Sequence, residues 1–537
     1  MLKLGFYKII LLFIVFFSSI FSQTGLLPLE HSFNNRLRSY LLNSGGLIHS
    51  SIQPYNLNEF IHIEDIDSVI SLGRQIHETK LSWLERKLFN EHLVTYTNDD
   101  YKISADFLPD FQLGYDFKNN RNTLLNSRGF LVKGSVTNTF SFYTEFYENQ
   151  AKFPSYLNSF VKQQAIIPGQ GFGRFFSTES FDYGYSSALL NYNPSEYFNI
   201  ALGHGKNFIG DGYRSFLLSD VAFNYPFVKL TASLNDVKYF IMWSQFEHLN
   251  TTPGSDGFMS DKKNGVFHYL DLHLSKNFTV GFFEGIIWLS NDSLYSRYGF
   301  DWNFLNPIIF LRPIDFSIGS PGNVVLGINA KMDISNYVSI YSQVMIDEMT
   351  VDEYFANNGY WANKYAVQFG SYAVTKFGPG NLFMRGELNT ASPFTFSHSN
   401  VIKNYGHYNQ PLAHPLGANF YEGIGILEYS LGHIESRVQL NYTRIGLDSS
   451  IGSSIGQDIY RSYELRPSNY GNYTAQGLDS RIFYANASLS YILNPFTNLR
   501  IEGAIAYRSI ETLKNTTQTL WFTVGLRSSF RNIYYDF

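Results

Sequence analysis

The densest set of ligand-binding groups in this chain lies in one stretch, residues 203–220. Glycines at positions 203, 205, 210 and 212 permit positive φ angles and close approach of the backbone to a bound group. The side chains that could hold a ligand by hydrogen bonds and ion pairs are Lys206, Asn207, Asp211, Tyr213, Arg214 and Asp220. The same groups can bond to one another instead. We expect a loop at the rim of the protein held by its own ion pairs, with ligand binding as the alternative.

Other stretches match catalytic or metal-binding patterns only in part. Residues 452–456 read Gly-Ser-Ser-Ile-Gly, the spacing of a nucleophile elbow, but they lie in a long Ser- and Gly-rich segment without the strand and helix that this motif needs. His204 could bind a metal with Asp211 and Asp220, yet no second ligand follows at the usual spacing. No Walker loop, EF-hand loop or His-Glu-x-x-His helix is present. We therefore predict a protein that is not an enzyme and holds neither a cofactor nor a metal.

The residues on both sides of the loop have the two-residue period of β-strands. Phe198, Ile200 and Leu202 alternate with small or polar residues before the loop, and the same period runs from about residue 103 to the end of the chain. Near the C-terminal end, Val438 and Leu440 alternate with polar side chains in the same way. Runs of about ten residues with one apolar face are what a tilted strand needs to cross a bilayer.

The polar face of these strands carries charges that would line the lumen of a barrel. They are Arg385, Glu387, Glu435, Arg437, Arg500, Glu502 and Arg508. We expect them to brace the barrel interior by pairing with one another, with a path for an ion or a polysaccharide as the alternative.

Short and long connections alternate between the strands. Short turns occur near residues 194, 235, 276, 335, 378, 432 and 495, and long polar loops near residues 148–182, 207–224, 247–264, 289–324, 349–363, 391–422 and 446–480. Outer-membrane barrels have short periplasmic turns and long extracellular loops. The fold class predicted is all-β, a transmembrane antiparallel outer-membrane barrel of roughly 18 strands.

Residues 1–102 differ from the barrel pattern. Lys3 and Lys8 precede an apolar run, and small residues follow, so residues 1–22 are predicted to be a signal peptide cleaved near Ser22. Residues 23–102 are expected to form a periplasmic or plug segment with short helices, and residues 103–537 the barrel. An amphipathic helix at residues 80–93, with Leu84 on its apolar side, is expected to pack as a plug or cap on the barrel.

Composition supports this class. Phe (49) and Tyr (39) are abundant, as in the aromatic girdles of membrane barrels, and Cys is absent. The formal net charge of −5 argues against a nucleic-acid partner, which would require a basic face.

The C-terminal residues carry a possible assembly signal. Ile533, Tyr535 and Phe537 alternate as in the terminal aromatic signal that the barrel-assembly machinery recognises. The apolar positions change from even numbers up to Leu526 to odd numbers from Ile533, and such a shift exchanges the two faces of a strand. The final segment can therefore be a tail that follows the closing strand.

Three stretches carry a resemblance to a known family. Residues 203–227, residues 50–55 (Ser-Ser-Ile-Gln-Pro-Tyr) and residues 534–537 (Tyr-Tyr-Asp-Phe) resemble the gliding-motility outer-membrane proteins of the RemB family of Bacteroidetes. In fold the chain is also similar to the Wzi-type capsule-assembly barrels, which hold exported polysaccharide at the cell surface. Neither family has a catalytic motif to transfer. The resemblance therefore implies a surface component.

We predict a non-enzymatic outer-membrane barrel that supports gliding motility or cell-surface adhesion. The expected partners are outer-membrane lipid and lipopolysaccharide, the barrel-assembly machinery, and surface polysaccharide or motility and adhesin proteins. The alternatives are a Wzi-like protein of capsule or exopolysaccharide assembly and, in a further class, a transport pore.

Overall fold

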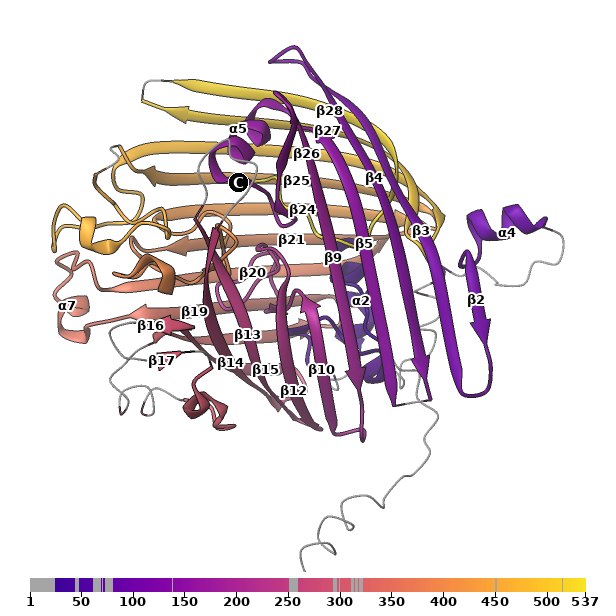
Figure 1. Ribbon diagram of the computed structural model, residues 1–537, viewed down its shortest axis with the longest axis horizontal. Helices are drawn as coiled ribbons and strands as arrows, with labels where there is room; N and C mark the ends of the chain where they lie inside the picture. The colour runs from indigo at the N-terminus through magenta and orange to yellow at the C-terminus, as the bar shows by residue number, and fades with distance from the viewer. Residues whose placement is uncertain are drawn as a thin grey trace, which may run out of the picture.

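The protein is seen in a computed structural model that describes residues 25–537 except 44–47, 61–68, 70, 73–80, 138, 251–258, 293–296, 299, 311–312, 314–316, 318–321, 450–451 and 514. Within these residues an antiparallel sheet of 18 wall strands closes into a barrel (Figure 1). This confirms the predicted fold class. The predicted signal peptide at residues 1–22 lies outside the described residues.

The wall strands follow one another in chain order. They are β3 (Tyr101–Asp116), β4 (Arg121–Val136), β5 (Phe140–Lys152), β9 (Ser180–Tyr192), β10 (Phe198–Gly205), β12 (Tyr225–Leu234), β13 (Val237–Asn250), β14 (Met259–Ser275), β15 (Phe278–Leu289), β18 (Asn323–Ser335), β19 (Val338–Glu348), β20 (Lys364–Phe377), β21 (Gly380–Ala391), β24 (Phe420–Leu431), β25 (Ile434–Leu447), β26 (Leu478–Asn494), β27 (Leu499–Thr512) and β28 (Thr516–Ser528). β28 closes the ring by pairing with β3, from Trp521 opposite Asp116 to Leu526 opposite Phe111.

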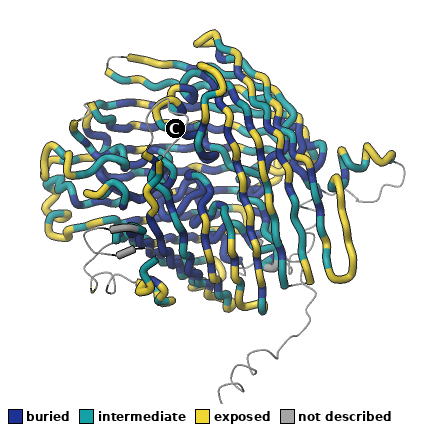
Figure 2. Tube along the Cα trace, viewed as in Figure 1, coloured by how far each residue is buried: buried dark blue, intermediate teal, exposed yellow. Residues whose placement is uncertain are grey.

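The wall has an apolar outside and a polar inside. On β25, Val438 and Leu440 are exposed on the outer surface, whereas Gln439 and Asn441 are buried toward the lumen. Exposed and buried residues alternate in this way along most of the wall strands (Figure 2). This follows from the two-residue period of a strand, because successive side chains point to opposite faces. β14 and β15 differ, because Phe304 packs with Val266 and Ile286 and both faces of these strands are buried.

The two ends of the barrel differ. At one end, here called the turn end, the strands are joined by short connections such as residues 235–236, 378–379 and 432–433. At the other, the loop end, residues 349–363, 392–419 and 448–477 form long connections that carry α7 (Val351–Phe355), η3 (Val401–Lys403) and η4 (Tyr463–Leu465). The alternation predicted from the sequence is therefore present.

Three segments enter the lumen. They are the N-terminal segment with α2 (His31–Asn43) and β1 (Ile52–Gln53), the loop at residues 206–224 with β11 (Phe208–Ile209), and the tail at residues 529–537. In Figure 1, α2 lies behind β5 and β9, within the ring of strands. β1 pairs with β11, Ile52 opposite Ile209, so the N-terminal segment and the loop share a small sheet.

A short helix lies outside the wall. α4 (Trp83–Phe89) and β2 (Val94–Thr97) project beside β3 (Figure 1), and no residue of α4 is buried. The expectation that this helix packs as a plug or cap on the barrel is wrong, because Leu84 is 59% exposed. None of the helices in the described ranges is long and apolar enough to cross a membrane.

Tyrosines on the lumen side lie over glycines of the neighbouring strand. Tyr341 of β19 is the register partner of Gly370 of β20, and its hydroxyl donates to Glu387 at 2.8 Å. A Cβ at position 370 would come within 2.4 Å of the Tyr341 ring. Gly370 thus gives the ring the space from which it supports Glu387.

We expect Gly370→Ala to lower the free energy of unfolding by about 1–3 kcal/mol, because the ring of Tyr341 is buried and has to move. The matched control is Gly386→Ala on the next strand, where nothing lies within 4 Å of the added carbon. Urea unfolding in detergent micelles, followed by heat-modifiable mobility on gels, measures both. Equal loss in the two variants would contradict the packing described here.

Candidate functional site

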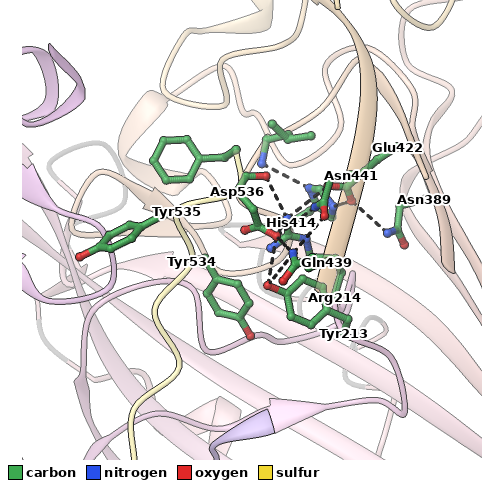
Figure 3. Close-up of polar contacts among 12 residues, drawn as sticks. Tyr213, Arg214, Asn389, His414, Glu422, Gln439, Asn441, Tyr534, Tyr535 and Asp536 are labelled. Carbon is green, nitrogen blue, oxygen red and sulfur yellow. Dashed lines mark hydrogen bonds and ion pairs between the residues drawn. The ribbon is translucent and has the colours of Figure 1, made fainter. Parts of the chain in front are cut away.

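The lumen site is built around Arg214, at the tip of the inward-folded loop. Its side chain is fully buried, and its Nη2 lies 3.2 Å from Glu422 Oε1 of β24 and 3.0 Å from Asp536 Oδ2 of the tail. The guanidinium also lies over the rings of Tyr213 and Tyr534. Figure 3 shows these groups converging from the loop, the wall and the tail. One cation therefore joins three segments that are far apart in the sequence.

The two carboxylates beside Arg214 are held by further donors. Glu422 Oε2 lies 2.7 Å from His414 Nε2 and accepts from Asn389 Nδ2 at 3.1 Å. Asp536 Oδ2 accepts from the hydroxyl of Tyr213 and from Asn441 Nδ2, both at 3.0 Å. Buried charges are stable only when they are paired and hydrogen-bonded. The two carboxylates meet this condition through Arg214 and through neutral donors from the wall and from two loops.

The backbone of the loop is fixed by Glu387 of β21. Its carboxylate accepts from the backbone N–H of Tyr213 at 2.7 Å and of Arg214 at 3.1 Å. A carboxylate that accepts two successive backbone amides sets the direction of the chain as well as its position.

Asp211 joins the loop to the N-terminal segment. It accepts from Ser50 Oγ at 2.6 Å, and Arg38 Nη1 of α2 lies 3.5 Å away. Burial alone would raise the pKa of this carboxyl, but Lys331 and Arg38 outweigh it and hold the pKa below its usual range. Asp211 is therefore ionised and serves as an anchor for both segments.

The remaining loop residues also bond to other parts of the chain. Asp220 accepts from the hydroxyl of Tyr534 at 2.7 Å, and its carbonyl accepts from Lys206 Nζ at 2.8 Å. Asn207 Oδ1 accepts from Lys229 Nζ of β12 at 2.8 Å. Of these three contacts, only the one from Lys206 joins two residues of the loop. The expected rim loop held by its own ion pairs is thus wrong, because residues 207–222 are buried in the lumen and their charged partners come from α2, the wall and the tail.

His31 of α2 contacts the tail. Its Nε2 lies 2.7 Å from the hydroxyl of Tyr534. Burial, together with Arg437, Arg385 and other nearby guanidinium groups, holds the pKa of His31 well below its usual range. The ring is therefore neutral and adds a hydrogen bond without adding charge.

The predicted lumen charges face inward and brace the inserted segments as well as one another. Arg385 Nη2 donates to the carbonyl of Asp211 at 3.2 Å. The other pairs are Glu435 with Arg36 (2.6 Å), Arg437 with Glu428 (3.2 Å), Arg500 with Glu30 (3.3 Å) and Glu502 (2.9 Å), and Arg508 Nε with the carbonyl of Phe537 (2.9 Å). Their bracing role extends from the wall to the segments that the wall encloses.

The residues predicted as an assembly signal lie in the tail. Ile533, Tyr535 and Phe537 belong to the segment after β28, which enters the lumen and is not part of the wall. The sequence-based inference of a tail is confirmed, since β28 ends at Ser528. Recognition of these residues by the assembly machinery stays a prediction.

A cavity of about 830 Å³ remains in the lumen. It is lined by α2, the tail and residues of the wall strands from β20 to β28 and from β3 to β5, and Tyr213, Tyr484 and Trp521 are among its lining residues. Arginines and glutamates that face it, such as Arg437 with Glu428 and Arg500 with Glu502, are paired with each other. The cavity thus has a polar, aromatic lining whose charges are largely compensated.

A second candidate surface lies at the loop end. Trp361 of the 349–363 loop is covered by the guanidinium of Arg466 at 4.0 Å and contacts Tyr463 at a ring distance of 4.6 Å. Tyr470 and Tyr473 beside it are 50% and 66% exposed. We call Trp361, Tyr463, Arg466, Tyr470 and Tyr473 the aromatic surface. No motif marks it in the sequence, although the aromatic content of the two loops was a visible signal.

The described residues do not bring the catalytic and metal-binding patterns of the sequence into the arrangements that those functions need. Ser454 is fully buried in the 448–477 loop, and its hydroxyl accepts from the backbone N–H of Gly456, so it has no strand–turn–helix setting. Across the described ranges, no group of three or more His, Asp or Glu side chains is placed to hold a metal ion, the suggested His204 set included.

We expect Arg214→Met to lower the free energy of unfolding by about 3–5 kcal/mol, because it leaves Glu422 and Asp536 buried without their cation. Arg444→Met is the control, since Arg444 pairs with Asp479 at 2.8 Å on the exposed side of the barrel and should contribute less than about 1 kcal/mol. Urea midpoints in detergent micelles measure both. Equal losses of unfolding free energy in the two variants would show that the Arg214 cluster stabilises the protein no more than an exposed ion pair does.

The buried side chain of His407 leads us to expect that the stability of the protein depends on pH. In the 392–419 loop, its Nδ1 accepts from the backbone N–H of Glu247 at 3.0 Å, and its Nε2 donates to the carbonyl of Asn224 at 3.1 Å. Burial lowers the pKa of His407 to about 3. The unfolded chain takes up this proton below its pKa near 6.5 while the folded one does not, so stability falls as pH drops. Between pH 7 and pH 5 the loss should be about 2 kcal/mol, and His407→Gln should remove that part of the slope.

Comparisons with known proteins place the fold. No protein-family model and no curated protein sequence matches the chain. Among solved structures the chain is similar to Wzi of Escherichia coli, an outer-membrane protein involved in group 1 capsule assembly that is a carbohydrate-binding β-barrel, with 12% identity, a TM-score of 0.54, and coverage of 94% of this chain and 98% of that one. It is also similar to OprD of Pseudomonas aeruginosa (10% identity, TM-score 0.41, 79% and 93% covered) and to OpdK of the same organism, solved with vanillate (7%, 0.42, 80% and 98%). The likeness shows an outer-membrane type of barrel fold.

Proposed function

We propose that the protein is a cell-surface barrel of the outer membrane that holds polysaccharide on the aromatic surface at its loop end. In this proposal the leader at residues 1–22 directs export, the turn end faces the periplasm, and the loop end faces outward. The observation that carries it is the aromatic surface itself, in which exposed tyrosine rings stand beside the half-buried Trp361 and charged groups.

The chemistry of this surface suits a glycan. Apolar faces of sugar rings pack on aromatic rings, and their hydroxyls bond to charged and amide groups. Tyr470 brings both kinds of contact together, because its ring is exposed while its hydroxyl donates to Glu353 at 3.1 Å. Arg466 is held in place over Trp361 and donates to Asn469 at 2.8 Å, so the polar groups are fixed before a ligand arrives.

The segments folded into the lumen support a binding role over a transport pore. Loop residues 207–222 are buried inside the barrel and joined to α2 and the tail. A solute would have to displace these buried ion pairs to pass. Planar-bilayer recordings should accordingly show no large steady conductance.

Gliding motility or adhesion is the second candidate. It rests on the resemblance at residues 50–55, 203–227 and 534–537, and these three stretches meet inside the lumen. They therefore support the barrel from within, and any contact with a motility or adhesin protein would use the loop end.

We expect Tyr470→Ser with Tyr473→Ser to weaken binding of isolated surface polysaccharide by at least about fivefold, because truncating an exposed aromatic contact costs about 1 kcal/mol or more. Tyr197→Ser is the matched control, since Tyr197 is 45% exposed at the turn end. Binding to protein in detergent micelles is measured by pull-down. Unchanged binding in the double variant would refute the role of this surface.

A deletion strain separates the two candidates in the cell. Polysaccharide shed into the medium with normal colony spreading supports glycan attachment, and lost spreading with retained polysaccharide supports motility. Complementation with the Tyr470 and Tyr473 double variant should fail in the first case.

A further inference from the structure

The helix α4 and the strand β2 leave large apolar side chains uncovered. Trp83 is 60% exposed and Leu84 59%, and on β2 Val94 is 58% and Tyr96 57% exposed. Exposing this much apolar surface to water is unfavourable, and contiguous patches of this kind mark a contact with a partner or a membrane.

The helix is specified locally and does not depend on packing. Ser82 and Glu85 form a capping box, in which each side chain bonds to the backbone N–H of the other residue. Lys87 and Arg86 pair with Glu91 at 2.8 and 2.9 Å. The helix thus forms without burying its apolar residues, which remain available for another contact.

The segment is nevertheless fixed to the turn end of the barrel. Asn494, at the end of β26, donates from Nδ2 to the carbonyls of Lys87 at 3.1 Å and Glu91 at 2.9 Å. His92 Nδ1 lies 2.6 Å from Asp106 Oδ2 of β3. The helix therefore sits at a set height, level with the rim where the wall strands turn back.

The exposed face continues the outer surface of the wall. β2 pairs with β3 so that Val94 lies opposite Ala105 and Tyr96 opposite Ile103. Opposed residues in an antiparallel pair share a face. On β3 the even-numbered Ser104 and Asp106 are buried inward, so Val94 and Tyr96 point outward, as does the exposed Phe107.

We propose that α4 and β2 form an interfacial anchor, whose side chains Trp83, Leu84 and Leu88 insert into the phospholipid surface at the turn end of the barrel. The occupant is a lipid surface because the patch is continuous with the lipid-facing side of the wall and lies at its rim. Tryptophan at the rim and a short amphipathic helix in the plane of the membrane are the usual elements of such contacts. The inference rests on the proposed membrane location of the barrel.

The test uses the absence of cysteine from the chain. Leu84→Cys, Phe107→Cys and Asp99→Cys are made singly in the full-length protein, labelled with an environment-sensitive fluorophore and inserted into phosphatidylethanolamine and phosphatidylglycerol vesicles. Phe107 marks the lipid-facing wall, and Asp99, exposed in the turn after β2, marks water. Heat-modifiable mobility confirms that each variant is folded. The vesicles carry a lipid spin-labelled near its headgroup, which quenches a label in contact with it.

We expect the label at position 84 to lose about as much fluorescence as the label at 107, and at least about threefold more than the label at 99. Quenching at 107 with none at 84 would overturn the anchor while leaving the membrane barrel intact, and would assign the patch to a protein partner. Quenching at neither 84 nor 107 would overturn the membrane location, and the anchor with it.

Discussion

The burial of charge inside a membrane-type barrel is the constraint on which this structure depends. A guanidinium in the lumen is tolerated only when carboxylates accept from it and neutralise its charge, and those of Arg214 come from β24 and from the C-terminal tail. The loop that carries Arg214 needs further contacts. Glu387 accepts from its backbone N–H groups, and Asp211 pairs with Arg38 of α2. Loop, N-terminal segment and tail are therefore mutually required, and the wall supplies the polar side chains between them.

The wall could be predicted from the sequence, because a strand exposed to lipid on one side and polar groups on the other repeats every two residues. Val438 and Gln439 show the pattern. In β14 and β15 both faces are buried, because Phe304 packs with Val266 and Ile286 on the second face. The tail could be predicted from the same two-residue period, since the apolar positions change from even to odd numbers between β28 and Ile533. What periodicity does not encode is the direction in which a loop folds. Lys206, Asp211 and Arg214 have the same polar character whether they face water or a polar lumen.

One feature of the sequence predicts that the loop at residues 206–224 folds into the barrel. Phe216, Leu217 and Leu218 follow one residue after Arg214, and all three are fully buried. An apolar run of this kind in a loop between two wall strands has to find cover, and the interior of the barrel is the nearest place. At α4 the structure differs from the prediction in the opposite direction. Its apolar stripe was expected to pack on protein, but it is exposed at the rim. An apolar stripe on a short helix therefore does not by itself predict that the helix packs on protein.

The position of the C-terminus has a practical consequence. The carbonyl of Phe537 accepts from Arg508, and Asp536 pairs with the buried Arg214, so both residues lie within the ring of strands. A bulky group joined after Phe537, such as a fluorescent fusion, therefore threatens the contacts that the tail makes with Arg214 and Asp220. Reporters for this protein belong in the exposed connection at residues 117–120, between β3 and β4, where insertion leaves both termini in place.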